Sequence, residues 1–311
     1  MEKPIATRFP RPEAQIDGGK LPFQARPFRV RKDLKTPRHW VRNEPCATAF
    51  FNALSVVFPH GEAFMIESVR PWQNKFDAKL AAEIAAFVEQ EAGHSREHIV
   101  MNRAVTSVGY DTAALDGAIR KFVSFFADSS PLTKLGATMC IEHITAIVGA
   151  EVIGNDKHLQ GADPELHKLW LWHGIEEIEH KAVAFDTWMA ATAHWSGTRR
   201  WLVRTALCLS VSASFFINRT RGQLELLRQD GMGKMTALPK LLRFGFGKGG
   251  VGRAVFRPWL AFLKPGFHPW QIDDRALIIK GENMLAALQL VTEGKVNIAL
   301  SPTRALHSKA A

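Results

Sequence analysis

The stretch FVEQEAGHSREHIVMN (residues 87–102) contains the spacing Glu-x-x-His, and LWLWHGIEEIEHKAVAFD (residues 169–186) repeats it. The pairs with this spacing are Glu91 with His94, and Glu177 with His180. On a helix, a residue and its i+3 neighbour lie about 60° apart, so each pair presents a carboxylate and an imidazole on one face. Apolar residues surround both pairs. The sequence therefore predicts two helices that turn these groups toward a common interior.

Two further glutamates extend the pattern: Glu62 in FPHGEAFMIES (58–68) and Glu142 in IEHITA (141–146). The order along the chain is then Glu, Glu-x-x-His, Glu, Glu-x-x-His, with separations that suit two helix hairpins. Ionised carboxylates in a low-dielectric interior repel one another and cost several kcal/mol each in lost hydration. Two divalent cations would balance four of them, and this ligand set is characteristic of ferritin-like di-iron and di-manganese bundles.

We expect two divalent metal ions, with iron favoured and manganese or zinc as alternatives, because carboxylate and imidazole together suit these metals better than calcium. The six expected ligands are Glu62, Glu91, His94, Glu142, Glu177 and His180. His98 and His173 lie on the same helix faces, and each is either an additional nitrogen ligand or a histidine packed in the core. Glu176 lies four residues before His180, so it is an alternative ligand to Glu177 or a general base.

Helical periodicity and helix-start signals continue through the middle of the chain. Expected helices cover residues 46–68 (with a kink near Pro59 and Gly61), 77–106, 112–127, a stretch from Pro131 and another from Pro164. Asp77 is a favourable N-cap, and proline is favoured at the first helical position. Strand alternation is scarce, so we expect an all-α fold. Its form would be a ferritin-like four-helix bundle with a basic N-terminal arm and additional C-terminal helices.

Charge divides the chain into three parts. Residues 46–197, the expected dinuclear metal-binding bundle, carry 19 Asp and Glu against 11 Lys and Arg. Residues 1–45, an expected extended arm, carry 11 Lys and Arg against 5 Asp and Glu. Residues 198–311 are expected to form a basic, partly apolar helical extension. Basic flanks favour anionic partners such as a membrane surface, whereas an acidic centre suits divalent cations.

The C-terminal part contains an apolar segment at residues 199–217. Its uninterrupted run Thr205–Ile217 has 13 residues, fewer than the roughly 20 that span a bilayer. We expect a buried helix here, with contact to an anionic membrane surface as the alternative, because arginines bracket the run. Residues 240–270 are expected to form an irregular wrapping segment or an interface, and residues 274–292 a last helix.

Motifs and composition argue against several other functions. GFGKGGVGRA (245–254) resembles a phosphate-binding loop, but Arg253 and Ala254 replace the lysine and the hydroxyl residue that such a loop requires. No nucleic-acid-binding motif accompanies the basic segments, so we expect no nucleic-acid partner. Three cysteines without a CxxC pair, and no apolar N-terminal leader, favour a cytoplasmic location, with peripheral attachment to the inner membrane face as the alternative.

Four segments carry a resemblance to a known family: FPHGEAFMIESVR, FVEQEAGHSREHIVMN, IEHITA and LWLWHGIEEIEHKAVAFD. They resemble a bacterial family of predicted metal-dependent hydrolases, over roughly residues 45–195. This resemblance implies hydrolysis. The order of the ligands is also similar to that of the wider ferritin-like di-iron superfamily, which implies redox chemistry with dioxygen.

The main functional expectation is a di-iron oxidase or oxygenase that acts on a small apolar or lipid-like substrate and uses an electron donor. The alternative is a two-metal-dependent hydrolase, in which the metal pair activates water and Glu176 acts as base. A third reading is a non-catalytic metal-binding or membrane-associated protein. A homodimer is compatible with each of these.

Overall fold

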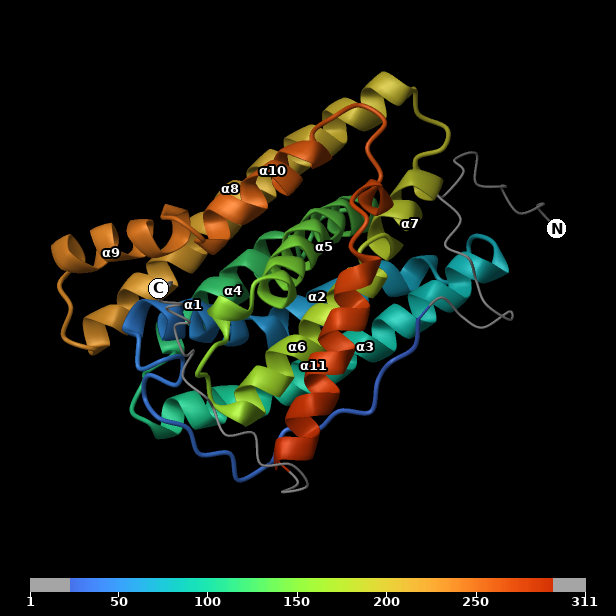
Figure 1. The fold of residues 1–311 in the computed structure, drawn as a ribbon. Coiled ribbons are helices and arrows are strands. Elements are labelled where there is room, and N and C mark those ends of the chain that lie inside the picture. Colours follow the sequence, from blue (N-terminus) through green and yellow to red (C-terminus); the bar gives the residue numbers. More distant parts are fainter. Residues whose placement is uncertain (1–22, 293–311) are drawn as a thin grey trace, which may run out of the picture.

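The computed structural model describes residues 23–292, and over this range the chain is helical without a β-strand (Figure 1). The α-helices are α1 (Pro45–Ser55), α2 (Phe58–Val69), α3 (Ala78–Ser107), α4 (Ala113–Phe125), α5 (Pro131–Gly154), α6 (Pro164–His180), α7 (Val183–Ala191), α8 (Gly197–Gln229), α9 (Lys234–Phe246), α10 (Val251–Phe262) and α11 (Arg275–Thr292). Short 3-10 helices are η2 (Arg70–Trp72), η3 (Asp156–His158) and η4 (Pro269–Gln271). The all-α prediction is confirmed for the described residues.

Local capping signals explain where the long helices begin. The Asp77 side chain accepts a hydrogen bond from the Leu80 backbone N–H at 2.8 Å at the start of α3. Ser130 caps α5 and Asp163 caps α6, and in both helices a proline follows within the first turn. A proline there loses no helical hydrogen bond, because the first N–H groups have no partner within the helix. These predicted starts are confirmed.

Two sequence expectations about helices are wrong. Residues 46–68 form two helices rather than one kinked helix: α1 ends at Ser55, α2 begins at Phe58, and Pro59 occupies the first turn of α2. Residues 240–270 are largely helical instead of irregular, because they contain the end of α9 and all of α10. In α10 the buried residues Val251, Val255 and Phe262 recur at helical spacing and pack inward, which offsets the cost of an internal proline.

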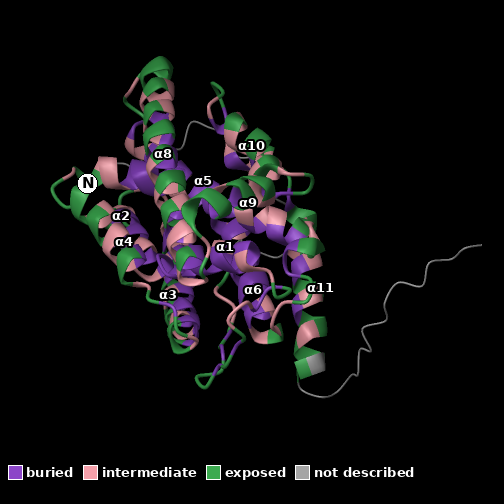
Figure 2. Ribbon diagram, turned by 90° about the vertical axis from the view of Figure 1, so that its left-hand side faces the viewer, coloured by how far each residue is buried: buried purple, intermediate pink, exposed green. Residues whose placement is uncertain are grey.

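Helix α5 lies at the centre of the molecule, with the other helices arranged around it (Figure 1). It packs against α2, α6, α7, α8 and α10, while α3 packs against α2 and α6. Almost the whole length of α5 is buried, whereas α8 and α10 carry exposed residues (Figure 2). The four helices that carry the predicted ligands are therefore neighbours around one interior.

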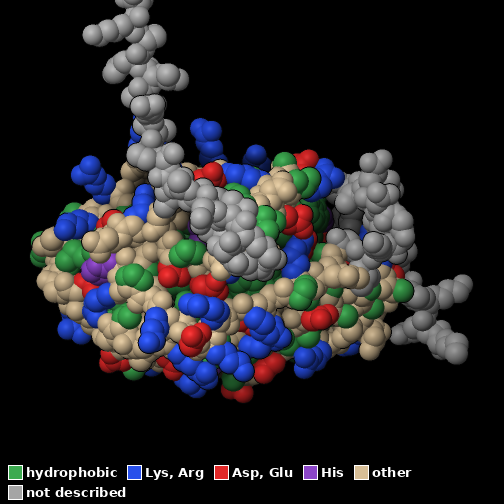
Figure 3. Space-filling view, turned by 60° about the horizontal axis from the view of Figure 1, so that its bottom comes forward, with side chains coloured by type: hydrophobic (Ala, Val, Ile, Leu, Met, Phe, Trp, Pro, Cys, Tyr) green, Lys and Arg blue, Asp and Glu red, His purple; other side chains and the backbone are tan. Residues whose placement is uncertain are grey.

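Residues 23–44, called the arm below, lie on the side of α3 opposite α8 (Figure 1). They contain no helix or strand, yet they pack into the core: Phe28 stacks on Trp172 with ring centroids 4.8 Å apart. The Val30 backbone N–H donates to Glu97 Oε2 at 2.8 Å. On the face toward the arm, Lys and Arg side chains are interspersed with Asp and Glu (Figure 3). Residues 1–22 of the predicted arm lie outside the described range.

Three helical stretches are long and apolar enough to cross a membrane by length and composition: Pro45–Trp72, Pro131–Gly154 and Gly197–Gln229. The most apolar parts of the first two are 67% and 78% buried inside the protein, whereas that of the third is only 22% buried. The prediction of a buried helix at residues 199–217 is therefore wrong. Instead α8 exposes large apolar side chains, such as Leu202 and Ile217, which are 54% and 51% exposed.

Candidate metal centre

The six predicted ligands converge in the interior of the bundle and are called the metal centre below. They come from α2 (Glu62), α3 (Glu91 and His94), α5 (Glu142) and α6 (Glu177 and His180). None of these side chains is more than 1% exposed. The helical spacing explains this convergence, because each Glu-x-x-His pair projects from the face that its helix turns toward its neighbours.

One half of the metal centre is grouped around His180. Its Nε2 lies 3.2 Å from Glu91 Oε1, 3.3 Å from Glu142 Oε2 and 3.6 Å from Glu177 Oε2. Glu91, Glu177 and His180 each offer one ligand atom, and these atoms lie within 4.8 Å of one another. That separation leaves room for one cation at bonding distance from each atom.

The other half is grouped around His94. Glu62, His94 and His173 offer ligand atoms that also lie within 4.8 Å of one another. His94 Nδ1 is 3.6 Å from an oxygen of both Glu91 and Glu177. The two glutamates of the repeated motif therefore lie between the two halves, in a position to be shared by two cations.

Unpaired polar atoms show that this site fits cations. Both carboxylate oxygens of Glu62, Glu91 and Glu142 are buried without a hydrogen-bond partner in the described part of the chain, as are Nδ1 of His94 and Nε2 of His180. Buried polar atoms in native proteins are almost always partnered. A cluster of unpartnered acceptors has the donor chemistry that divalent ions require.

Two side chains behind the metal centre orient its imidazoles. The Gln90 side-chain oxygen Oε1 lies 3.0 Å from His180 Nδ1, so a proton on Nδ1 leaves the Nε2 lone pair directed at the centre. Glu176 Oε2 lies 3.1 Å from His94 Nε2 in the same way, and its Oε1 accepts the Arg26 backbone N–H at 2.7 Å. Glu176, expected as a base or an alternative ligand, is therefore placed behind His94 and not in either ligand group.

The two additional histidines occupy different positions. His173 belongs to the His94 group, and its Nε2 lies 3.1 Å from Glu177 Oε1. His98 lies one step further out: its Nε2 is 3.0 Å from His173 Nδ1 and its Nδ1 is 2.9 Å from Ser55 Oγ. Both nitrogens of His98 therefore have partners. This arrangement favours the interpretation of His98 as a core histidine that orients His173 over its interpretation as a direct metal ligand.

Burial and mutual repulsion set the electrostatics of the metal centre. Burial raises the pKa of Glu142 well above its ordinary value, and the neighbouring Glu177 and Glu91 raise it further. Burial, followed by Glu91, raises the pKa of Glu62 in the same way. For Glu177, burial is outweighed by His173 and His180, so its pKa lies well below the ordinary value. The raised pKa favours the protonated form of the first two carboxyls, and bound cations would compete with those protons.

Two other histidines of the middle segment have their partners outside the metal centre. His143 Nε2 lies 3.2 Å from the Pro258 carbonyl, and burial lowers its pKa to about 4. His60 pairs with Asp116 at 3.0 Å, on the surface of α2 and α4. The structure therefore gives none of these three side chains a role in orienting ligands.

Sequence reasoning missed two residues that support the site. Gln90 carries no motif signal beyond being a polar residue on the buried side of α3, next to Glu91. Arg26 contacts Glu176 across a sequence separation of 150 residues, and its guanidinium pairs with Glu179 Oε2 at 2.6 Å. A contact at that separation leaves no local pattern by which the sequence could reveal it.

A family model described as predicted metal-dependent hydrolase matches residues 24–273, so this chain belongs to that family. The match is wider than the resemblance over 45–195 and includes most of the arm together with α8, α9 and α10. No curated protein and no solved structure matches the chain.

The family corrects the main functional expectation. An oxidase or oxygenase was expected from the ligand order, but the family that the chain belongs to is one of predicted hydrolases, and none of these comparisons points to dioxygen chemistry. The expected electron donor has no role in hydrolysis. The ligand order misled because the same carboxylate and imidazole set can serve a metal pair in either chemistry.

Proposed function

We propose that the protein is a hydrolase that uses two divalent metal ions bound in the metal centre. Glu62, His94 and His173 would hold one ion. Glu91, Glu177 and His180 would hold the other, with Glu142 beside His180. The observation that carries the proposal is the cluster of buried, unpartnered carboxylate and imidazole atoms in a chain of a predicted metal-dependent hydrolase family.

Metal ions in such a site polarise an ester or phosphoester group and lower the pKa of water, so that hydrolysis proceeds near neutral pH. The mixed oxygen and nitrogen ligands suit zinc, manganese or iron better than calcium. The charge of the ligands supports a pair of ions, because four carboxylates balance two dications. Glu91 and Glu177 lie between the two halves, so each could contribute a ligand to both ions.

The protein's own residues orient the ligands and exclude water. Gln90 and Glu176 can each accept a hydrogen bond from the outer ring nitrogen of a ligand histidine, which directs the inner nitrogen at the metal centre. The aromatic rings of Phe87 and Trp172 pack edge-on against His180 and His94. These contacts shield the metal centre from bulk solvent, and a low local dielectric strengthens its electrostatic interactions.

The test is an assay under nitrogen and in air with protein loaded with zinc or manganese. We expect turnover of 4-nitrophenyl esters or of bis(4-nitrophenyl) phosphate at the same rate in both atmospheres, and loss of turnover in Glu177→Ala together with loss of bound metal. Metal bound at the ligands without turnover of either substrate class would contradict hydrolysis.

A further inference from the structure

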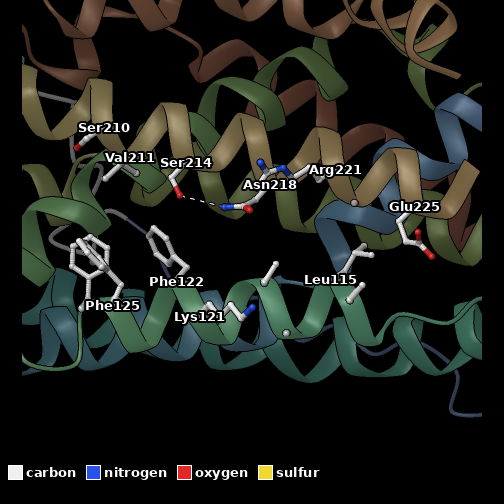
Figure 4. Close-up of a pocket in the computed structure, with 15 residues that line it drawn as sticks. Leu115, Lys121, Phe122, Phe125, Ser210, Val211, Ser214, Asn218, Arg221 and Glu225 are labelled. Carbon is white, nitrogen blue, oxygen red and sulfur yellow. Dashed lines mark hydrogen bonds between the residues drawn. The ribbon is translucent and has the colours of Figure 1, made fainter. Parts of the chain in front are cut away.

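A long groove opens on the surface between α4 and α8 (Figure 4). Its volume is about 820 Å³. Phe122 and Phe125 of α4 form apolar walls, and Phe125 is 78% exposed. Lys121 of α4 and Arg221 of α8 add positive charge to the groove, and Glu225 of α8 adds one negative charge. An exposed, largely apolar groove with basic side chains is a feature of ligand-binding surfaces.

A smaller cavity beneath this groove reaches the metal centre. Its volume is about 60 Å³, and Glu62 and Glu177 form part of its wall. The residues that line both the groove and the cavity are Ala118, Phe122, Val211, Ser214 and Asn218. The two spaces therefore adjoin at these five residues, and the inner space is lined by two carboxylates of the metal centre.

Arg219 also lines the small cavity and has an unusual environment. It is 6% exposed, its Nη1 donates to the Ala53 carbonyl at 2.6 Å, and it forms no ion pair within the described part of the chain. Burial alone lowers its pKa to about 10, with no acidic neighbour to oppose the shift. A buried cation without a counter-ion is costly, so an anionic group beside Arg219 would be stabilised when bound cations offset Glu62 and Glu177 in the same wall.

The sizes of the two spaces decide how a ligand would lie. One water molecule needs a cavity volume of about 10 to 15 Å³. The cavity of about 60 Å³ therefore has room for only a small polar group. The groove, which is more than ten times larger, accommodates an extended chain. The polar group would then lie between the guanidinium of Arg219 and the carboxylates of the metal centre, with the chain against Phe122 and Phe125.

We infer that the groove between α4 and α8 is the substrate entrance, and that the substrate is an amphiphile with a small anionic head, bound by Arg219, and an apolar chain. This inference rests on the proposed hydrolase function for the fate of the head group. A carboxylate and a phosphate ester share the required charge, but only the phosphate ester has a bond that hydrolysis can break; a carboxylate head would be the product of ester hydrolysis.

The test measures binding of four twelve-carbon probes to the full, zinc-loaded chain by calorimetry: dodecyl phosphate, dodecanoate, dodecanol and dodecyltrimethylammonium. We expect both anions to bind at least tenfold more tightly than dodecanol, and the cation to bind most weakly. Arg219→Met should remove the preference for anions over dodecanol, and Arg219→Lys should retain most of it. Tighter binding of the phosphate than of the carboxylate would identify a phosphoester head, and the reverse order a carboxylate.

Ser214→Trp, in the shared wall, should weaken binding of every probe at least tenfold. Ala213→Trp is the matched control, because Ala213 is its exposed neighbour on α8 and does not line the groove. Zinc content and thermal melting, measured for each variant, show that the fold and the metal centre are intact. Ser214→Trp also keeps the inference testable if Arg219→Met does not fold.

Equal affinity of the wild-type chain for dodecanol and dodecyl phosphate, or unchanged binding in Ser214→Trp, would overturn the inference even if ester hydrolysis were observed. Conversely, binding as expected without hydrolysis of any ester would contradict the proposed function and leave the anion-selective entrance intact. The two failures are therefore distinguishable.

Discussion

The metal centre buries polar groups that are usually exposed, whereas the outer face of α8 exposes apolar groups that are usually buried. At the metal centre, four carboxyl groups are fully buried, and most of their oxygens lack a hydrogen-bond partner. On α8, large apolar side chains such as Leu202 and Ile217 are exposed to solvent. Each group lies where its free energy is unfavourable in the isolated chain. The comparison teaches that burial and exposure alone do not account for either region. Bound cations, as proposed above, would stabilise the first, and the second is an apolar surface open to solvent in the described part of the chain.

The largest effect is expected from removal of a shared ligand. Glu91→Ala should abolish binding of at least one metal ion and all hydrolysis, because Glu91 lies between His94 and His180. Metal analysis after gel filtration measures the loss. Glu89→Ala is the matched control, since Glu89 is an exposed residue on the same helix. Equal metal content in both variants would show that the carboxylates at the centre are not ligands.

A smaller effect is expected behind the metal centre. In Glu176→Gln, one of two carboxylate acceptors becomes a donor, which disturbs the contact with either the Arg26 N–H or His94. Metal affinity should fall about 10- to 100-fold, as it does when groups that orient ligand histidines are removed. A competition titration with a chelator measures this. If hydrolysis fell while metal affinity stayed the same, Glu176 would be the base and not an orienting group.

The pH dependence of the melting temperature of the metal-free protein should report the ionisation of Glu142. Burial raises the pKa of Glu142, so its folded form retains a proton that the unfolded chain releases above about pH 4.5. This contribution to stability is present at low pH and is lost as pH rises toward the folded pKa. Glu142→Gln should therefore increase the melting temperature of the metal-free protein more at pH 8 than at pH 5. A gain that is independent of pH would contradict an elevated pKa.

The smallest effect on stability is expected on the outer face. Ile217→Ser should change the free energy of unfolding by no more than about 0.5 kcal/mol, because the side chain is 51% exposed. Phe87→Ala, in the core beside His180, should cost about 3–5 kcal/mol. Urea denaturation of both variants measures the difference. A large loss in Ile217→Ser would mean that this face of α8 is covered by another part of the protein or by a second copy.

Local sequence signals predicted what depends on neighbouring residues. Asp77, Pro131 and Pro164 placed the starts of three helices, because capping acts within one turn. The i+3 spacing brought Glu91 and Glu177 to one point, because each helix already fixes the face on which its pair lies.

What the sequence did not predict depends on packing between distant segments. The arm contributes the Arg26 N–H to Glu176 from 150 residues away. Prolines and glycines obscured α9 and α10, whose helical form depends on packing against α1, α5 and α8. The sequence also did not predict the exposure of α8. An apolar helix in the core and an apolar helix on the surface have similar compositions, so composition alone does not distinguish them.

The central claim is that the metal centre holds two cations, and anomalous X-ray diffraction from crystals of the zinc- or manganese-loaded chain tests it most directly. We predict two anomalous peaks. One should be bounded by Glu62, His94 and His173, and the other by Glu91, Glu177 and His180. A metal-loaded crystal with no peak at these residues, or with metal bound only at the surface, would contradict the claim.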